Sequence, residues 1–349
     1  MSSKMRIALI GYGYWGPNYA RVLNELPETC VTVICDAQRD RLERAASRFP
    51  NVALSSDLRE TLRRSDIDAV VVSTPASTHY EVARLALESG RHVLVEKPLA
   101  LEVEHCEQLE ELAGKMGRVL MVAHTFLYNP GIQKLRECVR SSSFGRVYYL
   151  HSTRTNLGPI RHDVNAIWDL APHDISIFNY LLDEVPVWAS AIGSRALGNA
   201  REDVGFITLG YANEVIGNIH ISWADPNKVR EVVVVGSRQR VVFNDLNDLE
   251  RVRVFEKGVS ADEPDAESFG EFKLLMRDGD IISPKINFSE PMKNQALEFV
   301  AAIGQNRRPV SDGITGTDVV MTLQAIEASI RERGRAVEVG KWKVASRSN

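Results

Sequence analysis

Apolar positions follow two different spacings along the chain, and the change falls near residue 125. Before it, short continuous apolar runs alternate with segments whose apolar residues recur every three or four positions. Continuous runs are typical of strands buried on both faces, whereas the longer spacing is typical of amphipathic helices. The alternation predicts an α/β fold, a doubly wound parallel sheet with crossover helices. We expect strands at 7–10, 30–35, 52–54, 68–73, 91–96 and 119–122, and helices just after residue 16 and near 39–48, 57–64, 77–89 and 102–116.

Beyond residue 125, and after a helix near 130–141, strand patterns follow one another without helices between them. Residues 215–222 alternate apolar and polar, as on a sheet with one exposed face. The pattern predicts an α+β domain over 126–349, built on an open, mainly antiparallel sheet, after a first domain over 1–125. Residues 257–271 carry five acidic side chains and are expected to form a loop. Expected strands are 147–155, 187–193, 204–210, 214–222, 230–236, 240–244 and 251–256, and apolar stripes predict helices around 296–303 and 319–330.

The first apolar run leads directly into a G-x-G-x-x-G motif, which is followed by a helical pattern. The apolar stripe of this helix is expected to comprise Tyr19, Val22, Leu23 and Leu26. In that context Gly11 permits the tight turn, Gly13 lets a pyrophosphate approach the backbone, and Gly16 lets the helix lie close to the strand. The phosphates would lie at a helix N-terminus, whose free N–H groups favour anions. Tyr14 and Trp15, inside the motif, are expected at the same cofactor site. The alternative is a glycine-rich turn without a ligand.

Asp36 ends the next predicted strand, 20 residues after Gly16. This is close to the spacing of an acid that binds the adenosine ribose hydroxyls of a dinucleotide. A carboxylate there would repel a 2′-phosphate, so the sequence favours NAD over NADP. Arg39 and Arg41 follow closely and could still accommodate a phosphate.

Composition restricts the remaining classes of protein. A length of 349 residues suggests two domains, and 44% hydrophobic with 25% charged residues is ordinary for a globular protein. The net charge of −4 indicates neither a nucleic-acid nor a membrane partner, and no apolar run is long enough to span a bilayer. Four cysteines show no metal-ligand spacing, and the N-terminus has no signal-peptide pattern, so we expect no metal and a cytoplasmic location.

Lys97 lies at the C-terminal end of a predicted buried strand, where ligands of doubly wound sheets bind. Poor solvation there favours the neutral amine, so Lys97 could act as a general base or acid on a hydroxyl. The alternative is an ordinary surface lysine. Other residues at these strand ends, expected around one crevice, are Gly11, Asp36, Thr74, Pro75, Glu96, Pro98 and His124.

A second group of polar residues lies in the second domain. Asp169 and His173 are four positions apart, which places them on one face of a helix, and such a pair can handle a proton. Alternatively, Asp169 caps a helix that begins at Pro172. Upstream residues form either a polar loop or a pocket for an anionic or hydroxylated substrate. The substrate-binding candidates are Arg154, Asn156, Arg161 and Trp168.

Taken together, these motifs resemble the Gfo/Idh/MocA family of nicotinamide-dependent sugar oxidoreductases across essentially the whole chain. The resemblance rests on the glycine motif, on Glu96-Lys97-Pro98 and on the spacing of Asp169 and His173. Within the family the pattern is most similar to dehydrogenases that oxidise the 3-hydroxyl of a UDP-N-acetylglucosamine-type nucleotide sugar or its uronate. Related ketosugar reductases share much of it.

The resemblance implies that Lys97 and His173 act on the substrate hydroxyl, with Asp169 in support. It also implies that Thr74, Pro75, His79 and Glu96 line the cofactor site, and that the open sheet serves a homodimer or homotetramer. The sequence thus predicts an NAD-dependent sugar dehydrogenase. The alternatives are an NADP(H)-dependent ketosugar reductase and a dinucleotide-binding sensor without turnover.

Overall fold

The computed structural model describes residues 4–158, 160–161, 163–198, 200–261 and 274–340. The chain divides into two compact units. The first unit comprises Met1–Tyr128 and Ser289–Met321, and the second comprises Asn129–Phe288 and Thr322–Asn349. This differs from the expected division into 1–125 and 126–349, because a late segment of the chain returns to the first unit.

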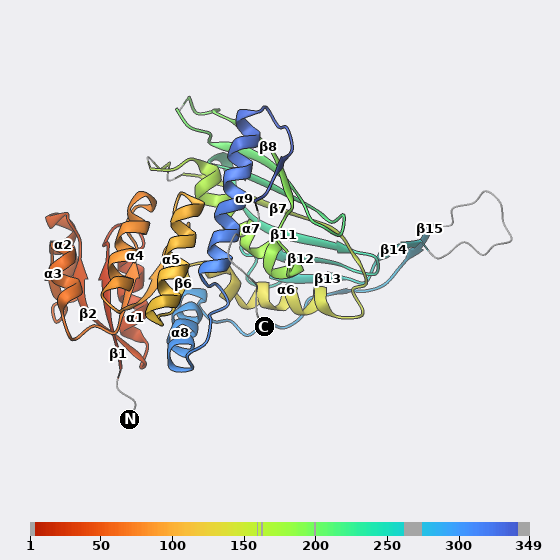
Figure 1. Ribbon diagram of the computed structural model, residues 1–349. Coiled ribbons are helices and arrows are strands. Elements are labelled where there is room, and N and C mark those ends of the chain that lie inside the picture. The colour runs from red at the N-terminus through yellow and green to blue at the C-terminus, as the bar shows by residue number, and fades with distance from the viewer. Residues whose placement is uncertain (1–3, 159, 162, 199, 262–273, 341–349) are drawn as a thin grey trace. The chain divides into compact units, whose positions relative to one another are not determined.

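The first unit is built on a six-stranded sheet in which every described pair is parallel (Figure 1). Its order is β3-β2-β1-β4-β5-β6, so the order reverses between β1 and β4, which is where dinucleotides bind in such sheets. The central strands β1 and β4 are buried on both faces, as their continuous apolar runs predicted. The strands are β1 (Met5–Ile10), β2 (Thr29–Cys35), β3 (Ala53–Ser55), β4 (Ala69–Val72), β5 (His92–Val95) and β6 (Leu120–Val122).

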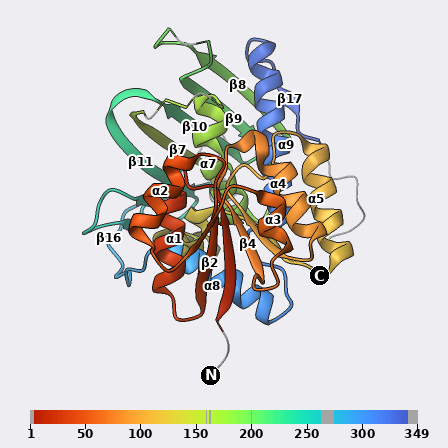
Figure 2. The same ribbon diagram turned by 90° about the vertical axis from the view of Figure 1, so that its left-hand side faces the viewer.

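Helices cover both faces of this sheet. Figure 2 shows α1 and α2 on one side, and α4 and α5 on the other. The buried residues of α1 include Tyr19, Val22 and Leu23, which is the predicted apolar stripe. Asp57 caps α3 by accepting a 2.9 Å hydrogen bond from the amide of Glu60. The elements are α1 (Gly16–Glu25), α2 (Arg39–Arg48), α3 (Leu58–Arg63), η1 (Ala76–Thr78), α4 (His79–Glu88), α5 (Val103–Met116) and η2 (Thr125–Tyr128).

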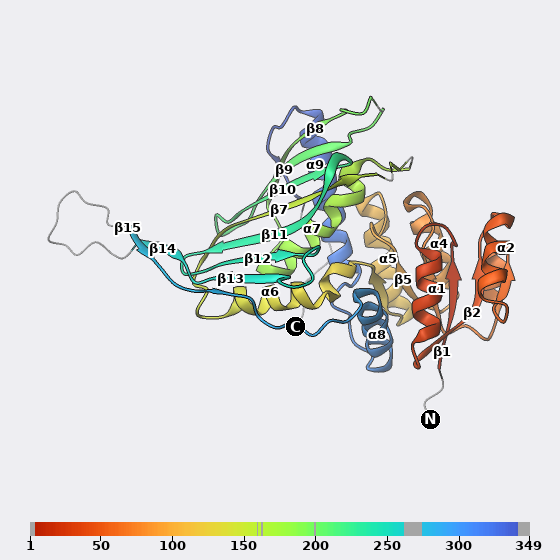
Figure 3. The ribbon, with the colours of Figure 1, turned by 180° about the vertical axis from the view of Figure 1, so that it is seen from behind.

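The second unit contains a nine-stranded sheet in the order β16-β13-β12-β11-β7-β10-β9-β8-β17. Figure 3 labels its strands from β8 to β13 in this order. Only the described pair of β7 and β10 is parallel, so the mainly antiparallel prediction is confirmed. The strands are β7 (Val147–Leu157), β8 (Trp188–Ser194), β9 (Val204–Gly210), β10 (Ile216–Ser222), β11 (Ala224–Gly236), β12 (Arg240–Asn244), β13 (Val252–Phe255), β16 (Ile281–Ile282) and β17 (Val337–Glu338).

The two faces of this sheet differ. Helices α6 (Pro130–Arg140) and α7 (Ala166–Leu182) pack on one face, where Leu150 and Ile207 are fully buried. On the other face the neighbouring residues Tyr149 and Phe206 are 46% and 54% exposed. The alternation of apolar and polar residues therefore identified a sheet with one covered face.

The predicted loop over 257–271 needs correction. Residues Gly258–Ala261 form β14, which pairs antiparallel with β15 (Leu274–Arg277) in a separate two-stranded sheet. All five acidic residues that suggested a loop fall within 262–271, outside the described residues, so they do not bear on the structure of 258–261.

Among the helices that the structure describes, none combines the length and apolarity needed to cross a membrane.

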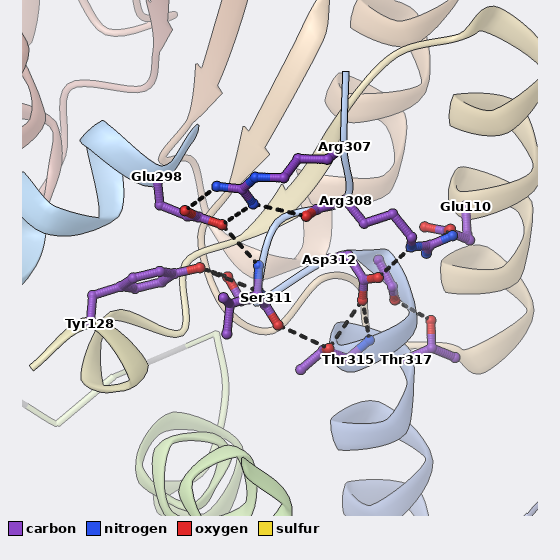
Figure 4. Close-up of polar contacts among 11 residues, drawn as sticks. Glu110, Tyr128, Glu298, Arg307, Arg308, Ser311, Asp312, Thr315 and Thr317 are labelled. Atoms are coloured by element: carbon purple, nitrogen blue, oxygen red, sulfur yellow. Dashed lines mark hydrogen bonds and ion pairs between the residues drawn. The ribbon is translucent and has the colours of Figure 1, made fainter. Parts of the chain in front are cut away.

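The returning segment contains α8 (Pro291–Gly304) and the first half of α9 (Gly313–Arg331). It attaches to β6 through Ser311, which accepts a 2.7 Å bond from the amide of Val122 and donates its hydroxyl to the Val122 carbonyl at 2.6 Å. The Tyr128 hydroxyl lies 2.8 Å from the Ser311 hydroxyl (Figure 4). Nearby, Arg308 forms an ion pair with Glu110 of α5. These contacts make the segment part of the first unit.

Candidate functional site

The glycine motif forms a tight turn between β1 and α1. Gly11 has a φ of +95°, and a Cβ there would lie 2.7 Å from the backbone of Ser73. A Cβ on Gly16 would lie 2.6 Å from the carbonyl oxygen of Gly11, so the helix begins almost in contact with the turn. These geometries confirm the roles predicted for the first and third glycines.

The middle of the turn can receive an anion. A Cβ on Gly13 would have only the guanidinium of Arg41 within 4 Å, at 3.6 Å. The backbone amides of Gly13, Tyr14 and Trp15 have no hydrogen-bond acceptor among the described residues. They precede or open α1, where the helix dipole also favours a negative charge. The turn therefore fits the pyrophosphate of a dinucleotide.

Asp36 follows β2 and is 6% exposed. Its carboxylate accepts 2.7 and 2.8 Å hydrogen bonds from the amides of Tyr12 and Gln38, and Arg41 lies 3.4 Å away. Three contacts leave lone-pair capacity for a ribose hydroxyl. Arg39 instead pairs with Glu43 on the surface, with 93% of its side chain exposed, so Arg41 is the arginine beside Asp36.

The Glu96-Lys97-Pro98 segment follows β5 at the same edge of the sheet. Glu96 and Lys97 are 8% and 6% exposed. The Glu96 carboxylate accepts a 2.7 Å bond from the Tyr19 hydroxyl and a 3.2 Å bond from the amide of Lys97. Lys97 therefore leaves the sheet within a fixed, largely buried segment, which is the setting predicted for a proton-handling lysine.

His79 connects the ends of two strands. Its Nδ1 lies 2.7 Å from the Pro98 carbonyl oxygen and its Nε2 lies 2.9 Å from that of Thr74. Each ring nitrogen lies within hydrogen-bonding distance of a backbone carbonyl oxygen, so this buried side chain lies between the two strand ends. Pro75, next to Thr74, is exposed at the same edge.

His124 lies just after β6 and is fully buried. Burial lowers its pKa to about 3, and the positive charge of Lys97 contributes a smaller part. The ring is therefore neutral at physiological pH. Neither ring nitrogen has a hydrogen-bond partner among the described residues.

In the second unit, α7 places Asp169 and His173 four positions apart on one helix. The helix begins after Asn165, whose side chain accepts a 2.9 Å bond from the amide of Trp168. It continues through Pro172, so the alternative in which Pro172 starts the helix is wrong. Asp169 forms an ion pair with Arg161 at 3.0 Å.

The two arginines among the substrate-binding candidates already have carboxylate partners within the chain. Arg154 makes a two-pronged ion pair with Asp174, at 2.7 and 3.0 Å, and both side chains are at most 5% exposed. Arg161 is paired with Asp163 and Asp169. Carboxylates of the chain itself already balance both charges. Of the other substrate-binding candidates, Asn156 donates to the carbonyl of Gly158, and Trp168 is 6% exposed.

Two polar residues at this site escaped the sequence reasoning. Tyr19 was assigned only to an apolar stripe, yet its hydroxyl bonds Glu96. Gln295 lies in α8, 276 residues from Tyr19 in sequence, and donates to the Tyr19 hydroxyl at 3.3 Å. A polar tip on a predicted apolar face was the one available signal for Tyr19, and no local pattern points to Gln295.

The fold and the strand-edge site of the first unit define an NAD-binding oxidoreductase. Residues 5–124 match the family model described as "Oxidoreductase family, NAD-binding Rossmann fold", and residues 132–242 match "GFO/IDH/MocA C-terminal domain". The chain belongs to the Gfo/Idh/MocA family.

Individual relatives differ in what their names say they oxidise. Inositol 2-dehydrogenase 2 of Saccharopolyspora erythraea is 32% identical over 224 residues. The aligned residues span 62% of this chain and 66% of that protein, which is just under two thirds of its length. UDP-N-acetylglucosamine 3-dehydrogenase of Acidithiobacillus ferrooxidans is 24% identical over 329 residues, 93% of this chain and 97% of that protein. The structure of GenD2 from gentamicin A biosynthesis in complex with NAD has a TM-score of 0.82 at 25% identity, with 98% of each chain covered.

Proposed function

We propose that this protein is an NAD-dependent dehydrogenase acting on a hydroxyl of a sugar or polyol. The observation that carries the proposal is the position of Lys97. It emerges, 6% exposed, from the same edge of the parallel sheet as the glycine turn and Asp36. A dinucleotide sensor has no evident use for a buried lysine at that position.

Each residue has a role in this proposal. The glycine turn and Asp36 hold the pyrophosphate and the adenosine ribose of the cofactor. When bound, NAD accepts the hydride from the alcohol carbon. Lys97 and His173 take or return the hydroxyl proton, and Asp169 supports His173. Because the Asp36 carboxylate repels a 2′-phosphate, NAD is preferred to NADP.

For the specific substrate we propose the 3-hydroxyl of a UDP-N-acetylglucosamine-type nucleotide sugar. The motifs around Gly13 and His173 support this choice, as does a relative of that specificity aligned along 93% of the chain. A relative acting on inositol supports a simple polyol instead. Of the two arginines, Arg161 is the better candidate for contacting the substrate, because 28% of its side chain is exposed, whereas Arg154 is buried against Asp174.

The decisive experiment is a substrate screen. Purified protein is mixed with NAD or NADP and with UDP- and dTDP-sugars, their uronates, and inositols, and the absorbance of the reduced nicotinamide is followed. We expect reduction of NAD with a UDP-N-acetylhexosamine. Turnover of inositol alone would contradict the nucleotide-sugar assignment. Tight NADH binding without any turnover would favour the sensor, and preference for NADPH would favour a ketosugar reductase.

We also propose that the protein forms a homodimer or homotetramer through the uncovered face of the nine-stranded sheet. Ile192, Phe206 and His220 lie side by side in register there, and the Phe206 and His220 rings stack at 4.5 Å. Phe206→Lys should shift the mass measured by light scattering to that of a monomer.

The four free cysteines of the chain suit a reducing, cytoplasmic location.

A further inference from the structure

A chain of four hydrogen bonds, three of them buried, leads from Thr125 through Gln295 of the returning segment to the amide of Lys97. The Thr125 hydroxyl donates to Gln295 Oε1 at 2.6 Å, and Gln295 Nε2 donates to the Tyr19 hydroxyl at 3.3 Å. The Tyr19 hydroxyl donates to Glu96 Oε1 at 2.7 Å, and the Lys97 amide donates to Glu96 Oε2 at 3.2 Å. All five residues belong to the first unit.

The direction of each bond in this chain is fixed by its neighbour. The Glu96 carboxylate can only accept, so the Tyr19 hydroxyl gives its single proton to Glu96. The phenol oxygen is then left to accept from the amide of Gln295, whose carbonyl oxygen accepts from Thr125. Burial, and then the charge of Glu96, raise the pKa of Tyr19 well above its usual value, so the donor stays protonated.

Burial makes this arrangement rigid. Gln295 is fully buried, and Tyr19 is 1% exposed, so water does not compete for their hydrogen bonds. Hydrogen bonds to a charged acceptor are stronger than neutral ones, and inside a core they hold the carboxylate in one orientation. The carboxylate in turn holds the amide of the residue that carries the amine.

We propose that Tyr19 and Gln295 are positioning residues of the dehydrogenase reaction. They hold the Glu96 carboxylate, and through it the backbone of Lys97, in the place from which the lysine reaches the substrate hydroxyl. The inference rests on the proposed role of Lys97. Proton transfer is sensitive to small displacements, so a loosened Lys97 backbone slows the reaction without removing any reacting group.

The chain provides a matched control for the test. Tyr19→Phe and Tyr128→Phe each remove one buried phenol hydroxyl from the first unit, and each hydroxyl takes part in two hydrogen bonds. Tyr128 bonds Ser311 in the returning segment (Figure 4) rather than Glu96. Both variants should therefore lose similar thermal stability, but only Tyr19→Phe should affect the reaction.

We expect Tyr19→Phe to lower kcat roughly 10-fold, with the sugar KM and the Kd for NADH from fluorescence titration changed less than about 3-fold. Gln295→Met should lower kcat by a smaller factor, because Tyr19 can still donate to Glu96. Tyr128→Phe should keep its kcat. Crystal structures of both phenylalanine variants should find the Glu96 carboxylate and the Lys97 backbone displaced only in Tyr19→Phe.

An unchanged kcat in Tyr19→Phe, or an equal loss in the two phenylalanine variants, would overturn the inference. If the unaltered protein oxidises no sugar, the proposed function fails by itself. The crystal structures then still decide the inference, because Glu96 and Lys97 in unchanged positions in Tyr19→Phe would overturn it.

Discussion

Each unit contains an aspartate beside an arginine among its candidate residues, and the two pairs behave differently. In the second unit, Arg154 and Asp174 meet through two short bonds, and both are almost completely buried. In the first unit, Asp36 and Arg41 approach only to 3.4 Å, and 29% of the arginine side chain is exposed. Asp36 is held mainly by backbone amides, so it keeps room for another partner.

The comparison separates ion pairs that maintain the fold from those available to a ligand. A charge whose hydrogen-bonding capacity is used within the chain contributes to structure, whereas one with unused capacity at a strand end can bind a cofactor. In the sequence, Arg154 and Asp36 are equally good ligand-binding candidates, because both residue types are typical of anion or hydroxyl recognition.

The largest expected effect is the loss of folding stability when the buried pair of Arg154 and Asp174 is broken. Asp174→Ala leaves Arg154 buried without its carboxylate, so the free energy of unfolding should fall by about 3–5 kcal/mol in urea titrations. Asp66→Ala breaks a partly exposed pair with Arg64 and should cost about 1 kcal/mol or less. If Asp174→Ala does not fold, the double variant Arg154→Met/Asp174→Leu should recover much of the loss. Equal effects of Asp174→Ala and Asp66→Ala would contradict the distinction.

Lys97 is expected to affect the reaction and not the fold. Lys97→Ala should lower kcat by roughly 100-fold or more, because positioned proton transfer contributes about that much. The melting temperature and the affinity for NADH should stay close to those of the unaltered protein. Lys115→Ala, at an exposed ion pair with Glu111, is the control. Near-normal turnover in Lys97→Ala would leave His173 as the sole candidate for the proton transfer.

Asp36 should affect cofactor choice. Asp36→Ala removes a charged acceptor of the ribose hydroxyls, so the affinity for NADH should fall roughly 10-fold or more. The gap between NADH and NADPH should narrow, because the remaining Arg41 attracts a 2′-phosphate. Asp36→Asn keeps acceptor capacity and tests charge alone. Fluorescence titration with both cofactors measures the effect, and tighter binding of NADPH by the unaltered protein would refute the assignment.

The smallest expected effect is the pH dependence of stability in the first unit. The pKa of His124 is about 3 in the folded protein, against an ordinary value of 6.5. Its contribution to stability is complete above pH 6.5, and it is lost as the pH falls from 6.5 toward 3, because only the unfolded chain binds the proton there. We expect a loss of about 1 kcal/mol per pH unit in urea titrations between pH 6.5 and 5. His124→Leu should flatten this slope, and an unchanged slope would exclude His124 as its source.

Local patterns predicted most of the architecture because buried strands and amphipathic helices depend on nearby residues. The same patterns predicted where the strands end, so Gly11, Asp36 and Lys97 could be assigned to one edge of one sheet. Contacts between distant segments could not be predicted. Nothing near Arg154 indicates that Asp174 pairs with it, since that contact depends on how α7 packs on β7. Likewise, the bond between Tyr19 and Glu96 joins positions 77 residues apart, and Gln295 reaches Tyr19 only after the chain returns.

That return has a consequence for the order in which the protein is made. The edge strand β6 obtains its antiparallel neighbour at Asp312 only after more than three hundred residues have been synthesised. Until then a nascent first unit would expose the β6 edge and the surface later covered by α8, both of which are sites for mispairing. A fragment truncated at residue 125 would keep this unfinished surface permanently. Any isolated version of the nucleotide-binding half should therefore carry residues 289–321 on a linker.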